Sequence, residues 1–187
     1  MEGLAGLISD RSDGQLVREV IGGEREAFNV LVRRWERKVY SYLVHLTGQS
    51  EDAWDMCQEA FLSAYTHLGE LRDAERFTPW LFQIAHNTAY SHLRGRREQE
   101  AEFAGVDPAA PSAVRLRDGT VWERGELRLL VEKALATLPM EQREALVLKF
   151  YQGFKFAEIA EIQNCPLSTV KTRVYAAFEQ LKKLLQA

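Results

Sequence analysis

Two short amphipathic segments separated by a tight turn, near the C-terminus, constrain this chain more than any other feature. The first segment begins at Phe156, and its apolar residues recur at helical spacing up to the turn at residues 163–166. The second segment starts after Pro166, and its apolar face consists of Val170, Val174, Phe178, Leu181 and Leu185. Asn164 can adopt the left-handed turn conformation, and Ser168 is a favourable N-cap for the second helix. The pattern predicts a helix-turn-helix.

Polar residues at the start of the second helix indicate what this motif binds. A recognition helix presents its N-terminal residues to base edges and phosphates, and here these are Ser168, Thr169, Lys171, Thr172 and Arg173. From Asn164 onward four basic residues outnumber the single acid Glu179, which suits contact with phosphate. Many three-helix scaffolds also contain two amphipathic helices around a turn. The small Ala160 at the expected helix crossing, together with the turn chemistry, favours DNA binding.

A second segment, residues 77–97, interleaves aromatic, amide, histidine and arginine side chains. Unpaired bases need such faces for stacking, donors for base edges and cations for phosphates. The spacing of Trp80, Leu81, Ile84 and Ala85 predicts a core stripe for those four. The other polar and aromatic residues of the segment lie on or beside other faces, and their chemistry fits either nucleic-acid contact or a solvated face. These residues are His86, Asn87, Tyr90, Arg94, Arg96 and Arg97.

A third segment, residues 51–61, carries four acids and no base within nine residues. Asp52, Asp55 and Glu59 lie three and four residues apart, so a helix places them on one face. No histidine or further acid stands at the spacing of a di-metal helix-bundle site. The face is therefore either simply solvated or a docking surface for a basic partner.

The remaining periodicity predicts an all-α chain of two small helical domains. Residues 1–97 form the first domain, with helices over roughly 13–22, 28–46, 50–68 and 78–93. Residues 98–124 contain six acids, three arginines and two prolines without a persistent helical face, which predicts an acidic, mobile linker. Residues 125–187 form the second domain, in which the helix-turn-helix follows a break at Pro139.

Composition narrows the function further. A net charge of -3 excludes a protein that coats nucleic acid by bulk charge, so DNA contact must be local or shared with a partner. Cys57 and Cys165 have no histidine at metal spacing, and we expect both to be small core residues. We find no catalytic constellation, so we expect no metal, no cofactor, no small-molecule substrate and no enzymatic activity. Without an apolar run long enough for a bilayer, a cytoplasmic location is expected.

Taken in order, these segments resemble a bacterial RNA polymerase sigma factor of the extracytoplasmic-function group, in the sigma-70 family. The resemblance covers about residues 13–97 and 127–185. Its motifs are Asp55-x-x-Gln58-Glu59-x-Phe61, then Phe77-x-x-Trp80-Leu81-x-x-Ile84-Ala85-x-Asn87 followed by Arg94, and finally Leu138-Pro139-x-x-x-Arg143 through Leu184. It implies a region 2 bundle and a region 4 helix-turn-helix joined by a linker.

The resemblance also implies partners for each segment. Asp52, Asp55, Gln58 and Glu59 would dock on the clamp helices of the largest polymerase subunit, and the polymerase flap would be a second core contact. The minus-ten element would be contacted by Phe77, Trp80, Asn87, Tyr90, Arg94, Arg96 and Arg97. The loop over residues 69–78 would capture a base flipped from the stack. The minus-thirty-five element would be read by Ser168, Thr169, Lys171, Thr172, Arg173 and Tyr175, and an anti-sigma protein would occlude these surfaces.

Three residues depart from the family pattern. Ser91 stands where the family usually has aspartate, and Asn164 and Ser168 stand at frequent glycine positions. Two other functions remain as alternatives. One is a stand-alone helix-turn-helix regulator whose first 97 residues sense a signal or dimerise, and the other is an RNA-binding helical protein. A sigma factor should co-purify with core polymerase, whereas a stand-alone regulator should bind its operator unaided.

Overall fold

Helices make up the whole regular structure of the part of the chain described by the computed structural model, residues 11–104 and 126–185. The elements are α2 (Asp13–Ile21), α3 (Glu26–Thr47), α4 (Ser50–His67), the 3₁₀ turns η1 (Leu68–Glu70) and η2 (Ala74–Arg76), α5 (Phe77–Ala104), α6 (Glu126–Ala136), α7 (Met140–Leu146), η3 (Val147–Tyr151), α8 (Phe156–Ile162) and α9 (Leu167–Leu185). The predicted all-α class is confirmed.

In the N-terminal bundle, α2 to α5, capping residues in the sequence mark where helices begin and end. At the start of α2, the side chain of Ser12 accepts a hydrogen bond from the backbone N–H of Gln15, whose own side chain closes a capping box. Gly48 ends α3 in the left-handed conformation, with a φ of 73°. Gln49 occupies the N-cap position of α4, and Ser50 is the first residue of that helix, as the predicted range of 50–68 has it.

Helix α5 is longer than the sequence pattern predicts. We expected a linker from residue 98, but α5 continues to Ala104. Its last residues alternate glutamate, glutamine and alanine, which are good helix formers that need no packed face to stay helical. The rest of the predicted linker, residues 105–124, lies outside the described residues.

In the C-terminal unit, α6 to α9, the helix-turn-helix forms as predicted. Asn164 has a φ of 46°, and the N–H of Cys165 donates to the carbonyl of Ala160 at 2.9 Å, which closes the turn after α8. The expected N-cap role of Ser168 is wrong. The carbonyl of Pro166 accepts from the N–H groups of Thr169 and Val170, so Ser168 already lies within α9.

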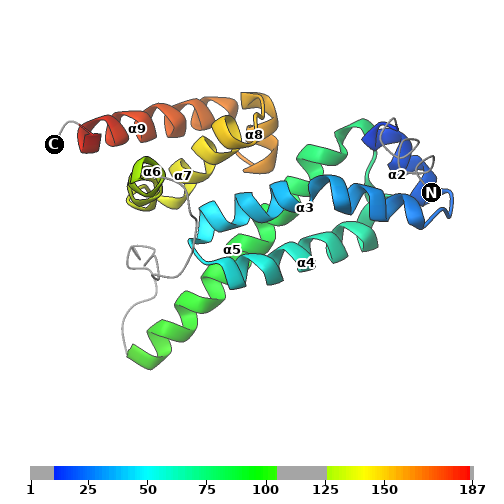
Figure 1. Cartoon of the computed structure of the whole chain (residues 1–187), viewed down its shortest axis with the longest axis horizontal. Coiled ribbons are helices and arrows are strands. Elements are labelled where there is room, and N and C mark those ends of the chain that lie inside the picture. The colour runs from blue at the N-terminus through cyan, green and yellow to red at the C-terminus, as the bar shows by residue number, and fades with distance from the viewer. Residues whose placement is uncertain (1–10, 105–125, 186–187) are drawn as a thin grey trace.

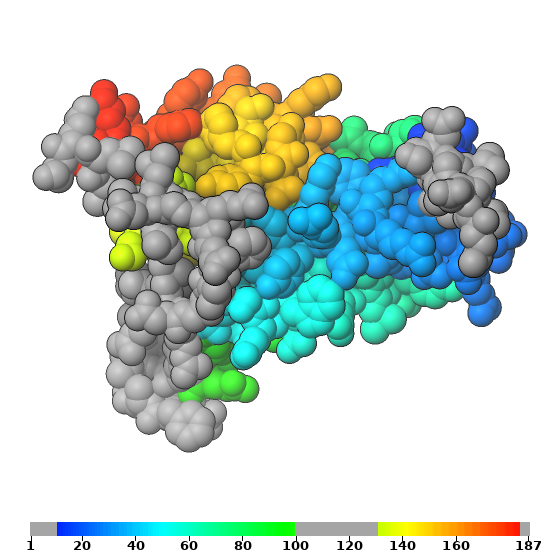
Figure 2. Space-filling view, in the orientation of Figure 1, coloured from blue at the N-terminus to red at the C-terminus, as the bar shows by residue number. Residues whose placement is uncertain are grey.

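The two units pack against each other. Helices α3 and α5 of the bundle contact α7, η3 and α8 of the C-terminal unit, whereas α4 lies on the far side of α3 and α5 (Figure 1). The space-filling view shows the C-terminal unit directly against α3 (Figure 2). The ring of Phe82 from α5 lies 4.8 Å from the ring of Phe154, so the hydrophobic core is continuous across the contact.

Candidate polymerase-docking and nucleic-acid surfaces

The outer face of α4 combines acids with exposed apolar side chains. Asp55, Gln58 and Glu59 are exposed there, as the helical spacing predicts. On the same helix Trp54, Leu62 and Tyr65 are 44%, 67% and 40% exposed. Burial of these apolar groups would be favourable, so the face has the composition of a binding surface more than that of a merely solvated one.

Two of the acids on α4 have partners on α5. A carboxylate oxygen of Asp52 accepts from Nη1 of Arg96 at 3.2 Å, and an oxygen of Glu59 lies 3.9 Å from Nε2 of His92. These exposed pairs contribute little to stability. They do join α4 and α5, so the predicted docking helix and the predicted minus-ten helix are neighbours.

The structure separates the predicted minus-ten residues into buried and accessible ones. Phe77 is fully buried and packs near Trp80, with ring centroids 6.2 Å apart, so its expected DNA contact is corrected to a core role. Trp80 and Tyr90 are half-buried, as is Arg96 beside Asp52. The exposed members of the set are Asn87, Arg94 and Arg97.

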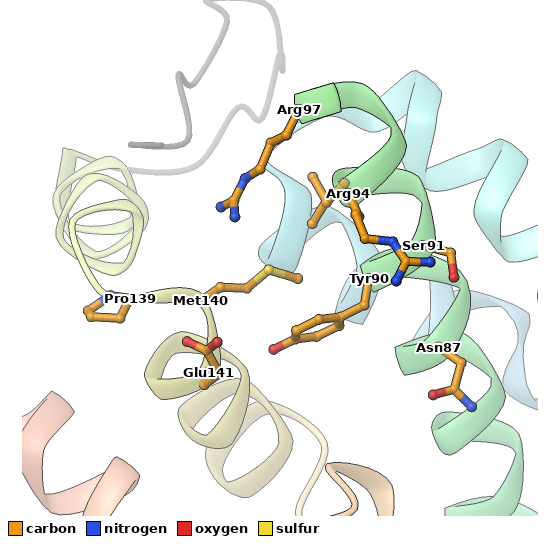
Figure 3. Close-up of a pocket in the computed structure, with 9 residues that line it drawn as sticks. Asn87, Tyr90, Ser91, Arg94, Arg97, Pro139, Met140 and Glu141 are labelled. Carbon is orange, nitrogen blue, oxygen red and sulfur yellow. The ribbon is translucent and has the colours of Figure 1, made fainter. Parts of the chain in front are cut away.

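Two hollows border these residues. The first, which we call the α5–α7 groove, has a volume of about 670 Å³ and runs between α5 and the start of α7 (Figure 3). Its lining is Asn87, Tyr90, Ser91, Leu93, Arg94, Arg97, Pro139, Met140 and Glu141. Tyr90 points across the groove toward Met140 and Glu141, while the departure at Ser91 leaves a small exposed hydroxyl on its α5 side (Figure 3).

The second hollow, the loop pocket, measures about 200 Å³ and lies at the loop for which the family resemblance implies base capture. Residues of the 69–78 loop and of α5 form most of its wall, and Glu161 of α8 completes it. The lining is Leu71, Arg72, Asp73, Arg76, Pro79, Trp80, Gln83 and Glu161. Half-buried Trp80 gives the pocket an aromatic face of the kind that stacks on an unpaired base.

A buried polar cluster joins the two units, and sequence reasoning missed it. The carboxylate of Glu144 on α7 is fully buried and accepts from the hydroxyls of Tyr42 and Tyr90 and from Nε2 of Gln163, the last at 2.8 Å. Nδ1 of His86 lies 2.7 Å from the same carboxylate. Burial, and then the Glu144 charge, raise the pKa of both tyrosine hydroxyls, which therefore stay protonated as donors.

Arg143, next to Glu144, is buried in a different way. Its guanidinium donates to the carbonyls of Leu135, Ala136 and Leu138 at the end of α6 and to the carbonyl of Leu46 near the end of α3. Burial lowers the pKa of Arg143 from its usual value. The polar cluster around Glu144 leaves one signal in the sequence: the charged pair Arg143 and Glu144 stands within the apolar run of α7 and η3.

The recognition helix α9 exposes most of the residues predicted for it. Ser168, Lys171, Thr172 and Tyr175 are exposed, whereas Thr169 and Arg173 are half-buried. Nη1 of Arg173 donates to Oε1 of Gln163 at 3.0 Å, so this guanidinium is held against the turn. A shallow hollow of about 260 Å³ lies beside these residues and Gln142.

Within the described ranges, no group of three or more histidine, cysteine or acidic residues is placed to hold a metal ion. Residues 11–104 and 126–185 also include no helix long and apolar enough to cross a membrane.

An acidic–apolar helix, an aromatic–basic helix and a helix-turn-helix in one all-α chain define a class of two-part DNA-binding transcription proteins. Comparison with known proteins identifies the family. Residues 31–99 match Sigma-70 region 2, and residues 128–181 match Sigma-70, region 4. The chain belongs to the sigma-70 family of RNA polymerase sigma factors, in its extracytoplasmic-function (ECF) group.

Individual relatives agree over nearly the whole length. The chain is 34% identical to the RNA polymerase sigma-H factor of Pseudomonas aeruginosa, over 96% of this chain and 97% of the relative. It is 35% identical to the ECF RNA polymerase sigma-E factor of Escherichia coli (strain K12), over 94% and 95% of the two chains.

Solved structures show the same architecture. The sigma factor RpoE, in complex with the anti-sigma factor NepR from Bartonella quintana, superposes with a TM-score of 0.71 at 26% identity, over 86% of this chain and 97% of that one. CnrH, in complex with the cytosolic domain of CnrY, has a TM-score of 0.69 at 24% identity, over 93% and 97%, which shows a shared fold.

Proposed function

We propose that this sigma factor docks on core RNA polymerase through α4 and reads promoter DNA with two separate surfaces, on α5 and α9. The observation that carries the proposal is the exposed acidic–apolar face of α4 beside an aromatic–basic α5. Asp55, Gln58 and Glu59 supply the charge for basic residues of the clamp helices, and Trp54 and Leu62 supply apolar area.

The minus-ten element is assigned to α5 and the loop before it. Asn87, Arg94 and Arg97 are accessible for base edges and phosphates. The loop pocket, with Trp80 on its wall, has room to hold a base that has left the stack. Unstacking costs a few kcal/mol, and contacts in the pocket offset that cost, so strand opening is driven by binding to the single strand.

The minus-thirty-five element is assigned to α9, which enters the major groove with its N-terminal residues leading. Ser168, Lys171, Thr172 and Tyr175 are accessible for this contact. Further along α9, Phe178 forms an exposed aromatic pair with Phe150, with ring centroids 5.1 Å apart. We assign that pair to the polymerase flap, because the burial of two exposed aromatic rings by a protein partner is favourable.

The domain division follows from these assignments: the first domain docks on core and reads minus ten, and residues 125–187 read minus thirty-five. The solved relative RpoE is held by an anti-sigma factor. We propose an anti-sigma partner for this chain too, which would cover the same surfaces. We also place the protein in the cytoplasm, where core polymerase works, and assign it no enzymatic activity.

Run-off transcription with reconstituted holoenzyme on genomic fragments tests the proposal. We expect discrete transcripts only when the chain and core polymerase are both present, with weak binding of duplex promoter DNA by the chain alone. Tight binding of an operator by the isolated chain, without co-purification of core polymerase, would instead identify a stand-alone regulator. Binding to structured RNA in preference to DNA would support the RNA-binding alternative.

A further inference from the structure

Helix α2 lies outside the part of the chain that matches Sigma-70 region 2, which begins at residue 31, and the surfaces proposed on α4, α5 and α9 do not include it. The helix packs on α3, on η2 and on the start of α5 (Figure 1). It therefore contacts the loop over residues 69–78, which forms most of the wall of the loop pocket. This places α2 where it can set the shape of that pocket.

Apolar contacts fix α2 and the loop to the same core. Leu16 and Val17 are fully buried, and Leu71 and Ala74 of the loop pack against the core that contains them. Such burial accounts for α2 as a structural helix of the bundle. Polar contacts at its N-terminal end go further, because they hold individual residues of the loop.

The carboxylate of Asp13, the first residue of α2, joins three helices. Its Oδ2 accepts from the hydroxyl of Thr78 at 3.1 Å and from Nε1 of Trp35 at 2.9 Å, while its Oδ1 accepts from Nη1 of Arg34. The side chain of Asp13 is only 18% exposed, and hydrogen bonds to an ionised acceptor are stronger than those between neutral groups. Asp13 thus fixes the point at which the loop becomes α5.

A second contact holds η2, in the middle of the loop. Oε1 of Glu75 accepts from Nη1 and Nη2 of Arg18, each at 3.2 Å. The same carboxylate lies so close to buried Gly14 that a Cβ there would be 2.1 Å from Oε1. The exposed ion pair alone contributes little to stability. The close fit of Glu75 over Gly14 is specific, because any side chain at position 14 would displace the carboxylate.

Residues of the loop that contact α2 alternate with residues that line the pocket. Glu75 and Thr78 bond to α2, whereas Arg76 and Trp80 belong to the pocket wall. Arg76 directly follows Glu75, and Trp80 stands two positions after Thr78, so a shift of either contact residue moves part of the wall. The position of the aromatic face of the pocket therefore depends on α2.

We propose that α2 is a positioning element for base capture, in which Asp13 and Gly14 hold the loop over residues 69–78 in the shape that receives an unstacked base. The proposal rests on the proposed function of the loop pocket, but the hold on the loop is a property of the free chain. A pocket that already has its binding shape pays less ordering entropy when the base enters. Affinity for the opened strand falls in proportion to the fraction of chains with that shape.

Hydrogen exchange in the full, free chain tests the hold on the loop without DNA or polymerase. The N–H groups of Leu71, Glu75 and Arg76 donate to acceptors within residues 68–73, so they exchange with solvent only when the loop opens. A variant that releases the loop from α2 should therefore accelerate exchange at these amides and leave α4 and α9 unchanged.

Thr78→Val keeps nearly the same shape but lacks the hydroxyl that donates to Asp13, and we expect amide exchange over residues 69–78 to become about fivefold faster. Thr78→Ser restores the hydroxyl and should return exchange to the wild-type rate. Thr137→Val is the matched control, since it removes a hydroxyl that donates to the carbonyl of Ala134, at the end of α6. It should leave exchange of the loop unchanged.

Gly14→Ala tests the second contact, and it should also accelerate exchange of the loop. Glu75→Ala removes the atoms that the new methyl group would meet, so the addition of Gly14→Ala to that variant should cause little further change. Equal effects of Gly14→Ala with and without Glu75 would overturn the role of this contact. Circular dichroism checks folding, and Thr78→Val decides the test if Gly14→Ala unfolds. Wild-type exchange of the loop in folded Thr78→Val would overturn the proposal.

Reconstituted holoenzyme connects the hold on the loop with base capture. The probes are single strands of the minus-ten element of a promoter found by run-off transcription, either intact or with one base at a time removed. With the wild-type chain, we expect the removal of one particular base to weaken binding most. Thr78→Val should weaken binding of the intact strand about threefold and leave binding of the strand without that base unchanged.

A loss of equal size for both strands would overturn the positioning role, because a merely structural defect does not depend on the captured base. If no base removal weakens binding of the wild-type holoenzyme, base capture in the loop pocket fails. Faster exchange of the loop in Thr78→Val would in that case still support the hold of α2 on the loop, so the two failures are distinguishable.

Discussion

Two neighbouring charges, Arg143 and Glu144, are buried by different means. The last carbonyls of a helix lack partners within it, and the guanidinium of Arg143 supplies donors to such groups at the ends of both α6 and α3. The positive charge also lies at the negative ends of two helix dipoles. Glu144 depends instead on side-chain donors, most of them from the other unit. Arg143 thus fixes helix ends, while Glu144 fixes the contact between units.

The two cysteines should differ in reactivity. Burial, and then the nearby charge of Glu36, raise the pKa of the Cys57 thiol to about 12, so at neutral pH almost none of it is the reactive thiolate. Cys165 is half-buried in the turn between α8 and α9. We expect one thiol per native chain to react with a disulfide reagent near pH 7, and two after denaturation.

Mass spectrometry of the modified chain should locate the native reaction at Cys165, and Cys165→Ser should abolish it. Rapid modification of Cys57 in the native chain would show that the N-terminal bundle opens far more readily than its packed core implies. Above pH 7 the rate at Cys57 should rise with each unit of pH, because the thiolate fraction increases toward the raised pKa.

For single residues, the sequence predicted the chemical character of a surface more accurately than it predicted which side chains are buried. Asn87, Arg94 and Lys171 are accessible, as their polar character suggested, and Asn164 adopts the expected left-handed turn. Phe77 was misassigned because a motif marks a position without saying which way its side chain faces. The partners of Glu144 could not be predicted, since they are brought together by contacts between residues up to 102 positions apart.

Among the helices, α4 shows most directly how local pattern becomes a surface. Ala53, Met56, Cys57, Ala60 and Ala64 are buried against the bundle, so the residues between them must face outward. This leaves an acid-rich stripe bordered by Trp54 and Leu62. One apolar face of α4 is buried in the bundle, whereas the apolar side chains of the outer face are exposed to water. A protein partner that covered this outer face would remove them from water.

Charge reversal on this stripe should weaken polymerase binding. Asp55→Lys places a cation opposite the basic partner that we propose, and we expect affinity for core polymerase to fall about tenfold, mainly through slower association. Glu59→Lys should act similarly. Fluorescence anisotropy of labelled chain with core polymerase, at several salt concentrations, measures both changes.

Glu24→Lys supplies the matched control, because it makes the same charge change at an exposed site before α3. Unchanged polymerase affinity in both α4 variants would remove the docking role of this helix. A loss of equal size in the control would point to net charge, instead of the stripe, as the cause.

The helices themselves were largely predictable, since their periodicity and stop signals are local. The turn at Asn164 ended α8 where expected, and α3 ends at Gly48, close to the predicted end at residue 46. Helix ends without strong signals were less accurate. Ser168, expected as an N-cap, lies inside α9, and α5 runs on to Ala104 because favourable helix propensity alone can extend a helix that is already nucleated.

At the scale of the whole molecule, a net charge of -3 limits what the free chain can do with DNA. We expect the two surfaces that we propose, one on α5 and one on α9, to bind one promoter together when polymerase holds both. In this proposal the α9 surface anchors the closed complex, and the α5 surface acts once the strands part.

Asn87→Ala should therefore affect the two stages unequally. We expect holoenzyme with this variant to form closed complexes at nearly normal affinity and to form open complexes about tenfold less well, because a contact made only with the opened strand is lost. Permanganate footprinting measures strand opening, and filter binding at low temperature measures the closed complex.

Ser91→Ala is a suitable comparison, since it removes one small polar group from the same side of α5 without touching the amide. Equal losses at both stages for Asn87→Ala would argue against a role in capturing the opened strand. Arrest at the closed stage would support it.

The packing of the two units lay beyond prediction from the sequence. Phe82 and Phe154 are apolar and would suit the interior of either domain alone, so periodicity does not reveal that they meet. Glu144 likewise looks like one more surface acid of a region 4 helix. Only the assembled chain shows that charge and aromatic groups were placed for a contact between units.

Residues 105–125 join the two packed units covalently, so the contact between the units forms within one molecule. Fully extended, this stretch spans at most roughly 75 Å, enough for the units to part but not to escape each other. A tether of such length gives an effective local concentration on the order of millimolar. The units can therefore pack on each other through contacts, such as that between Phe82 and Phe154, that would be too weak to join separate molecules.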